Sequence, residues 1–137
     1  MLIIVFDLDI FKERESDLHK LLEHQSDDLW FGLTNPDFEL FLLLHVENAI
    51  DEIIMPNKQL IKENKKIGNH RPCYKLLSEQ TKINSKKNAA IGNLAHKIDI
   101  AIKQEKEINQ DLSLCMRDIT SNIASLIEKI RNDKLPI

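Results

Sequence analysis

The chain has 137 residues, which is the size of one domain and leaves no room for two ordinary ones. Its 42% apolar content allows a hydrophobic core, and its net charge of -3 does not predict nucleic-acid binding from overall charge. No apolar run reaches the ~18 residues of a membrane span, and the start lacks the basic segment of a signal peptide.

The two cysteines, Cys73 and Cys115, have no C-x-x-C spacing, which predicts reduced thiols in a cytosolic protein. Basic side chains are concentrated in one stretch of the chain. They are Lys58, Lys62, Lys65, Lys66, Arg71, Lys75, Lys82, Lys86 and Lys87. Such a local face can bind phosphates, although a solvated lysine-rich face is equally ordinary.

The first nine residues, MLIIVFDLD, form an apolar run that ends in two aspartates. The run predicts a strand buried on both faces. Residues two apart in a strand point to the same side, so Asp7 and Asp9 are expected to converge at its carboxyl end, where open α/β sheets bind ligands. Mg²⁺ would relieve the repulsion between them. The alternative is an Asp-x-Asp turn that ends the strand and caps a helix.

Residues 12–25 predict a polar helix with a narrow apolar stripe, and residues 28–34 predict a second strand. Two strands joined by a helix are most naturally parallel neighbours. A helix follows, with Asn35 as its N-cap and Pro36 at its first position. It is apolar nearly all round, which is typical of a buried helix, and Pro56 is expected to end it.

The remaining residues predict helices and one loop. The helices cover residues 58–66, 73–83, about 84–109, and a last one capped by Asp118 or Thr120. The loop covers residues 68–72. The predicted fold is therefore α/β and helix-rich. A sheet of about two strands lies in residues 1–55, and a helical region, residues 56–137, packs with it as one domain.

Other polar residues have two interpretations each. Glu39, in the first turn of the apolar helix, is either a partner of the helix dipole or a third acidic ligand or general base. Asn35 is interpreted as a cap rather than a catalytic residue, and His45 as a hydrogen-bonded core residue rather than a ligand. His70, Arg71 and Lys75 could bind a phosphate backbone, or could belong to a solvated loop and helix.

The stretch TNPDFELFLLLH resembles a motif of the RloB-like family, the AbiL type of bacterial abortive-infection proteins. Members have a D-x-D strand end and then S-N-P-x-F-E-x-W-x-x-L-H. The matching residues are Asp7, Asp9, Thr34, Asn35, Pro36, Phe38, Glu39, Leu43 or Leu44, and His45, with Phe41 in place of the family's tryptophan. Later matches are Tyr74-Lys75, Ala90-Ile91 and a looser pattern from Ser121 to Ile130.

The resemblance implies a Toprim-like fold in which the D-x-D pair binds Mg²⁺ or Mn²⁺. It also implies a nuclease of bacterial phage defence that cleaves DNA or RNA, tRNA included, with an ATPase as its partner. On this reading Asp7 and Asp9 are metal ligands, and Glu39 joins them as a catalytic residue.

Family members usually begin with a strand that ends in E-G-x-x-T-E, and this sequence has no such element. The chain is therefore expected to be a fragment, a mis-started gene product or one piece of a split pair. The alternative function is a non-catalytic interaction module that docks on an ATPase or completes a divided domain. Residues 1–6 would expose apolar faces and an unpaired edge, which predicts a homo-oligomer or a partner at that strand.

Overall fold

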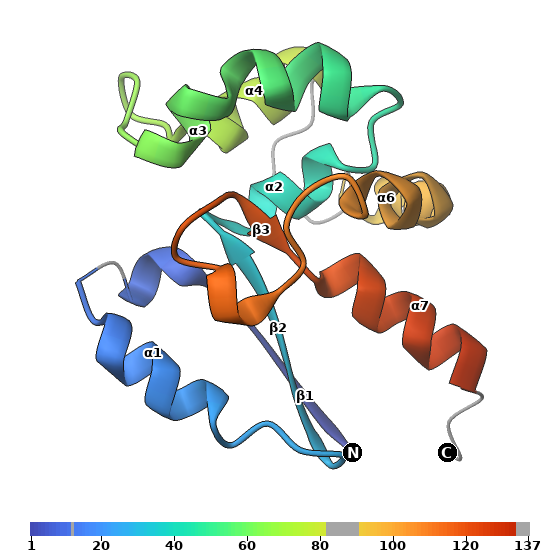
Figure 1. Ribbon diagram of the computed structural model, residues 1–137. Coiled ribbons are helices and arrows are strands. Elements are labelled where there is room, and N and C mark those ends of the chain that lie inside the picture. Colours follow the sequence, from blue (N-terminus) through green and yellow to red (C-terminus); the bar gives the residue numbers. More distant parts are fainter. Residues whose placement is uncertain (12, 82–90, 134–137) are drawn as a thin grey trace.

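The computed structural model describes residues 1–11, 13–81 and 91–133, which fold around a small mixed sheet (Figure 1). Strand β1, Leu2–Asp7, pairs in parallel with β2, Leu29–Asn35, from Leu2 opposite Leu29 to Asp7 opposite Thr34. A short strand β3, Thr120–Ser121, pairs antiparallel with the end of β2. The predicted helix-rich α/β fold and its parallel strand pair are confirmed, whereas β3 was not predicted.

Two helices cover opposite faces of the sheet (Figure 1). Helix α1, Glu15–Leu22, packs on one face, where Leu18, Leu33 and Cys115 form a small apolar cluster. Helix α7, Ile123–Asp133, approaches the other face at Gly32. A Cβ added to Gly32 would lie 3.1 Å from a methyl group of Leu126, so the absence of a side chain lets α7 pack closely on β2.

The remaining helices gather beyond the carboxyl ends of β1 and β2 (Figure 1). They are α2, Phe38–Leu43; a π-helix, Ile50–Ile54; a 3₁₀ helix, Met55–Asn57; α3, Lys58–Glu63; α4, Pro72–Thr81; and α6, Ile98–Glu105. Three further 3₁₀ helices are Leu8–Phe11, Asn93–Lys97 and Leu112–Leu114. The principal hydrophobic core lies among these elements and includes every residue of α2 from Leu40 to Leu43.

Strand β1 lies at the edge of the sheet, which corrects the prediction that both of its faces are buried. Leu2 and Val5 are 58% and 51% exposed, and Ile4 is also exposed, because no described element covers them. None of the helices in the described residues is both long and apolar enough to cross a membrane.

Two predicted helix boundaries are wrong. Pro56 does not end the apolar helix, because the chain leaves α2 already at Leu44 and Pro56 lies inside the 3₁₀ helix that leads into α3. Neither Asp118 nor Thr120 caps α7, since Thr120 belongs to β3. The predicted start of the long helix, at residues 84 and 85, lies outside the described residues.

The buried side-chain amide of Gln104 stabilises the non-helical segment between α2 and the π-helix. The Gln104 side chain donates to the carbonyls of Leu44 (2.8 Å) and Val46 (2.7 Å) and accepts from the Ile50 amide (3.1 Å). These backbone groups lie where the helical hydrogen bonds of α2 have ended. One side chain of α6 therefore satisfies three groups that burial would otherwise leave unpaired.

Replacing Gln104 with leucine is expected to lower the free energy of unfolding by about 2 to 3 kcal/mol, because it leaves those buried groups without partners. Urea denaturation followed by circular dichroism measures the change. Gln59→Leu is the matched control, since Gln59 is exposed and makes one surface hydrogen bond to Glu63. Equal stability of the two variants would contradict the structural role of Gln104.

Candidate active site

Asp7 ends β1 at the point where the two parallel strands meet α2. Its carboxylate accepts hydrogen bonds from the Thr34 hydroxyl, at 3.4 Å, and from the backbone amide of Phe38. Burial raises the pKa of Asp7 above its ordinary value, and the negative charges of Asp9 and Glu39 raise it further. The carboxylate is thus fixed in place by β2 and α2, in a field that disfavours its negative charge.

Asp9 lies beside Asp7 for a different reason from the one predicted. The strand stops at Asp7, and Asp9 belongs to the 3₁₀ helix Leu8–Phe11 rather than to the same strand face. Its backbone amide donates to the Pro36 carbonyl at 3.4 Å, which ties the segment after β1 to the segment after β2. The Asp9 side chain is exposed and remains close enough to Asp7 to raise the pKa of that residue.

A second acidic pair, Asp37 and Glu39, follows β2 just as Asp7 and Asp9 follow β1. Glu39 is half-buried in the first turn of α2, and its charge acts on both Asp7 and Asp37. Asp37 was not among the site residues predicted from the sequence. The signal that could have found it is the repeated spacing, because an acid-x-acid pattern lies at the end of each of the two parallel strands.

Asp37 is the most deeply buried carboxylate of the four. Its side chain is only 5% exposed, and burial, followed by the charges of Glu39, Asp7 and Asp9, raises its pKa to about 7. The thiol of Cys73 on α4 is hydrogen-bonded to it, and burial raises the pKa of that thiol well above its ordinary value. We call the four carboxylates of Asp7, Asp9, Asp37 and Glu39 the acidic group. It extends from the end of the parallel strands into the core.

The acidic group matches Mg²⁺ in donor chemistry and in charge. Hard cations bind carboxylate oxygens, and one buried oxygen, Oδ1 of Asp37, has no hydrogen-bond partner. Among the described residues, however, no three His, Cys, Asp or Glu side chains meet closely enough to hold a metal ion. A cation here would therefore be held by two carboxylates and would take its other ligands from water or substrate, which Mg²⁺ tolerates.

A cavity of about 160 Å³ opens beside Asp9. Asn35 and Pro36 line it from the end of β2, and Lys62 and Asn64 line it from the end of α3. In the sequence, Lys62 is only one member of the basic stretch from Lys58 to Lys87. The structure places it in the same cavity as Asp9, where its ammonium group could contact a phosphate.

The three basic residues selected from the sequence lie on the loop before α4 and on α4 itself. Arg71 donates to the backbone carbonyl of Asn64 at 2.6 Å, which brings its guanidinium group next to a wall of this cavity. His70 stacks on Tyr74 with ring centroids 4.5 Å apart. Lys75 forms an exposed pair with Glu79, at 3.9 Å, and is not gathered with the acidic group.

Comparison with known families decides the classification of the chain. A model of the family described as RloB-like protein matches residues 1–130. The chain belongs to the RloB-like family. No curated protein and no solved structure gave a significant match to this RloB-like chain.

Two motif residues of the RloB-like chain serve its structure. The prediction that Asn35 caps α2 is wrong, because Asp37 occupies the N-cap position. The Asn35 side chain instead donates to the carbonyls of Cys115 (2.7 Å) and Asp118 (3.0 Å). His45 is a hydrogen-bonded core residue, as predicted. It is 3% exposed, its Nδ1 lies 3.0 Å from the Phe41 carbonyl, and burial lowers its pKa.

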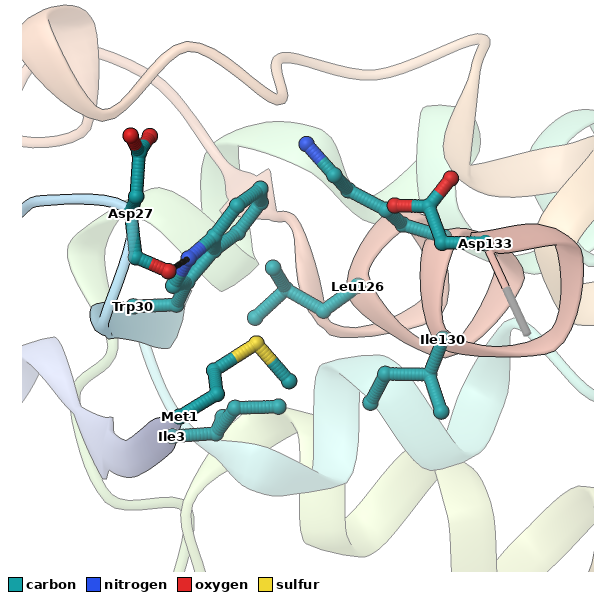
Figure 2. A pocket seen from close by; sticks show the side chains of 8 residues that line it. Met1, Ile3, Asp27, Trp30, Leu126, Ile130 and Asp133 are labelled. Atoms are coloured by element: carbon teal, nitrogen blue, oxygen red, sulfur yellow. Dashed lines mark hydrogen bonds between the residues drawn. The ribbon is translucent and has the colours of Figure 1, made fainter. Parts of the chain in front are cut away.

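A second cavity of the RloB-like chain, of about 190 Å³, lies at the opposite ends of the strands, between the sheet and α7 (Figure 2). Met1, Ile3 and Leu126 give it an apolar floor. The Trp30 indole donates to the Asp27 carbonyl at 3.0 Å, and the Lys129 ammonium lies 3.7 Å from the indole centroid. This cavity contains none of the four carboxylates and is separate from the candidate active site.

Proposed function

We propose that this RloB-like chain is the nuclease component of a bacterial phage-defence system and cleaves phosphodiester bonds of DNA or RNA with Mg²⁺ or Mn²⁺. The observation that carries the proposal is the group of four carboxylates at the carboxyl ends of two parallel strands. This is the end of a parallel sheet at which ligands bind. Host tRNA is one candidate substrate, and an ATPase encoded with the chain is the candidate partner.

Each residue has a distinct task in the proposed reaction. Asp7 and Asp9 hold the cation, and when bound it would neutralise the phosphate and lower the pKa of an attacking water. Glu39 accepts the proton of that water as a general base. Lys62 and Arg71 bind phosphate oxygens at the cavity beside Asp9, with His70 and Lys75 farther along the same nucleic acid.

The purified chain is expected to cleave labelled single-stranded DNA, double-stranded DNA or tRNA when 5 to 10 mM Mg²⁺ is present, on the order of the millimolar affinities of sites that keep several waters. Removal of the metal with EDTA should stop cleavage, and added Mg²⁺ should restore it. Gel electrophoresis of the labelled products measures the rate. Cleavage that persists in EDTA would contradict the proposal.

A second candidate function is that of a non-catalytic subunit, and the edge position of β1 favours it. An apolar edge strand with unpaired backbone groups is a template for another strand. Under this proposal β1 pairs with a second copy of the chain or with a partner that contributes further strands to the sheet. Catalysis would then need that partner, and the chain alone would be inactive.

Association through β1 is expected to be sensitive to charge on the strand. Ile4→Lys should shift the chain toward monomer in multi-angle light scattering, because a lysine on an edge strand disfavours pairing. Ile10→Lys is the matched control, since Ile10 is 60% exposed but lies outside the strand. A wild-type chain that stays monomeric at high concentration would contradict self-association at β1.

A further inference from the structure

The Asp37 side chain occupies an N-cap position without acting as a cap. Its backbone is extended, with φ -149° and ψ 172°, and its carboxylate makes no capping hydrogen bond to α2. The Leu40 amide donates to the backbone carbonyl of Asp37, at 3.1 Å, and lies near enough to the carboxylate to lower its pKa in part. The first turn of α2 therefore stabilises this carboxylate only weakly.

One oxygen of this carboxylate lacks any partner although the residue is 95% removed from solvent. Cys73, which is fully buried, is hydrogen-bonded to Asp37, whereas Oδ1 has no hydrogen-bond partner. A buried carboxylate oxygen without a donor or a cation is strongly unfavourable. A bound cation would satisfy this oxygen, and a proton on the carboxylate would remove the charge instead.

The negative charges nearest to Asp37 add to the cost of keeping its carboxylate ionised. Asp7, Asp9 and Glu39 all repel it, and Asp7 is held next to it by the hydrogen bond from the Phe38 amide. None of the ion pairs in the described part of the chain includes Asp7, Asp9 or Asp37. A positive species between Asp37 and Asp7 would satisfy the unpaired oxygen and offset the repulsion together.

We propose that Asp37 is a direct ligand of a divalent cation, which it shares with Asp7. The inference rests on the proposed function for the presence of the cation and makes Asp37, in place of the exposed Asp9, the second direct ligand beside Asp7, with Asp9 acting through a water of the cation's shell. With two protein carboxylates on the ion, water fills most of its shell, as Mg²⁺ tolerates. The competing account is that Asp37 carries a proton and binds no ion.

Mn²⁺ binding to the whole chain tests this inference without any measure of activity. Electron paramagnetic resonance of free Mn²⁺ gives the dissociation constant. Asp37→Asn keeps the shape of the side chain and removes its charge, and it is expected to weaken Mn²⁺ binding at least about tenfold, the cost of losing one close charged contact. Asp51→Asn, an exposed aspartate of the π-helix, should leave binding unchanged.

A second measurement on the wild-type chain does not depend on any variant folding. In ¹³C spectra of the side-chain carboxyl groups, the diamagnetic ion Mg²⁺ is expected to shift the signals of Asp37 and Asp7 together. A shift confined to Asp7 and Asp9 would place the ion at those two residues alone and overturn the role of Asp37.

The outcomes separate the inference from the proposed function. If Asp7→Asn abolishes Mn²⁺ binding while Asp37→Asn binds as tightly as wild type, Asp37 is not a ligand and the proposed nuclease site stands. If wild-type protein neither binds Mn²⁺ nor shows a carboxyl shift with Mg²⁺ at millimolar concentrations, both proposals fail.

Discussion

Asp7→Asn is expected to reduce metal-dependent cleavage by about 100- to 1,000-fold, the usual cost of removing one charged group that stabilises a reacting centre. The variant keeps the shape of the side chain and an oxygen that can accept hydrogen bonds from Thr34 and Phe38. It removes a negative charge that burial and two neighbouring carboxylates make unfavourable. The structure therefore predicts that activity falls while the melting temperature does not.

Single-turnover cleavage of a labelled oligonucleotide and thermal denaturation of the same preparations measure the two effects. Asp51→Asn is the control for the loss of one acidic side chain away from the site. A variant that keeps full, EDTA-sensitive activity would remove Asp7 from the active site. A variant that loses activity only because it unfolds would leave its role as a ligand unsupported.

The second large effect is expected at Glu105, whose buried carboxylate holds the start of α7. It accepts hydrogen bonds from the amides of Ala124 (2.7 Å) and Ser125 (2.9 Å), from the Ser121 hydroxyl (2.7 Å) and from the Gln110 amide group (2.8 Å). Burial raises the pKa of Glu105, and these four hydrogen bonds act in the opposite direction. Glu105, on α6, thus accepts hydrogen bonds from first-turn amides of α7, which have no partner within their own helix.

Glu105→Ala is expected to lower the free energy of unfolding by about 3 to 5 kcal/mol, because several buried donors lose their acceptor at once. That is a large share of the total stability of an ordinary domain. Urea denaturation measures the change, with Glu107→Ala, at an exposed position two residues away, as the matched control. A loss below about 1 kcal/mol, the worth of one ordinary hydrogen bond, would be inconsistent with this role.

Sequence patterns located the strand ends but not the start of α2. The β-branched run before Asp7 and the turn into α1 are local features, and they predicted the parallel pair correctly. Asn35 and Asp37 are both good N-cap residues, and local preference does not choose between them. Distant contacts decide which of the two becomes the N-cap. The carbonyls of Cys115 and Asp118, 80 and 83 residues farther along the chain, accept hydrogen bonds from the Asn35 side chain and keep Asn35 in β2.

The same reason explains why the end of α2 was missed. The apolar run continues without a break through Leu44, so its periodicity indicates one long helix. The helix ends at Leu43, Gln104 on a distant helix binds the carbonyls released there, and Asn48 turns the chain with φ 59° before the π-helix. The burial of Asp37 against Cys73 also depends on the packing of α4. The acid-x-acid spacing could indicate the negative charge of Asp37. It could not indicate that one oxygen of this carboxylate has no hydrogen-bond partner.

The order in which the chain is made bears on when the sheet can form. Asn122 binds β2 by accepting from the Leu33 amide and donating to the Phe31 carbonyl, both at 2.8 Å. These contacts span 89 and 91 residues, so β2 gains them only after the chain as far as Asn122 has left the ribosome. Asp7 and Asp37 flank this strand, so the acidic site is expected to be assembled late in synthesis. A nascent chain would then carry the acidic motifs without their final geometry.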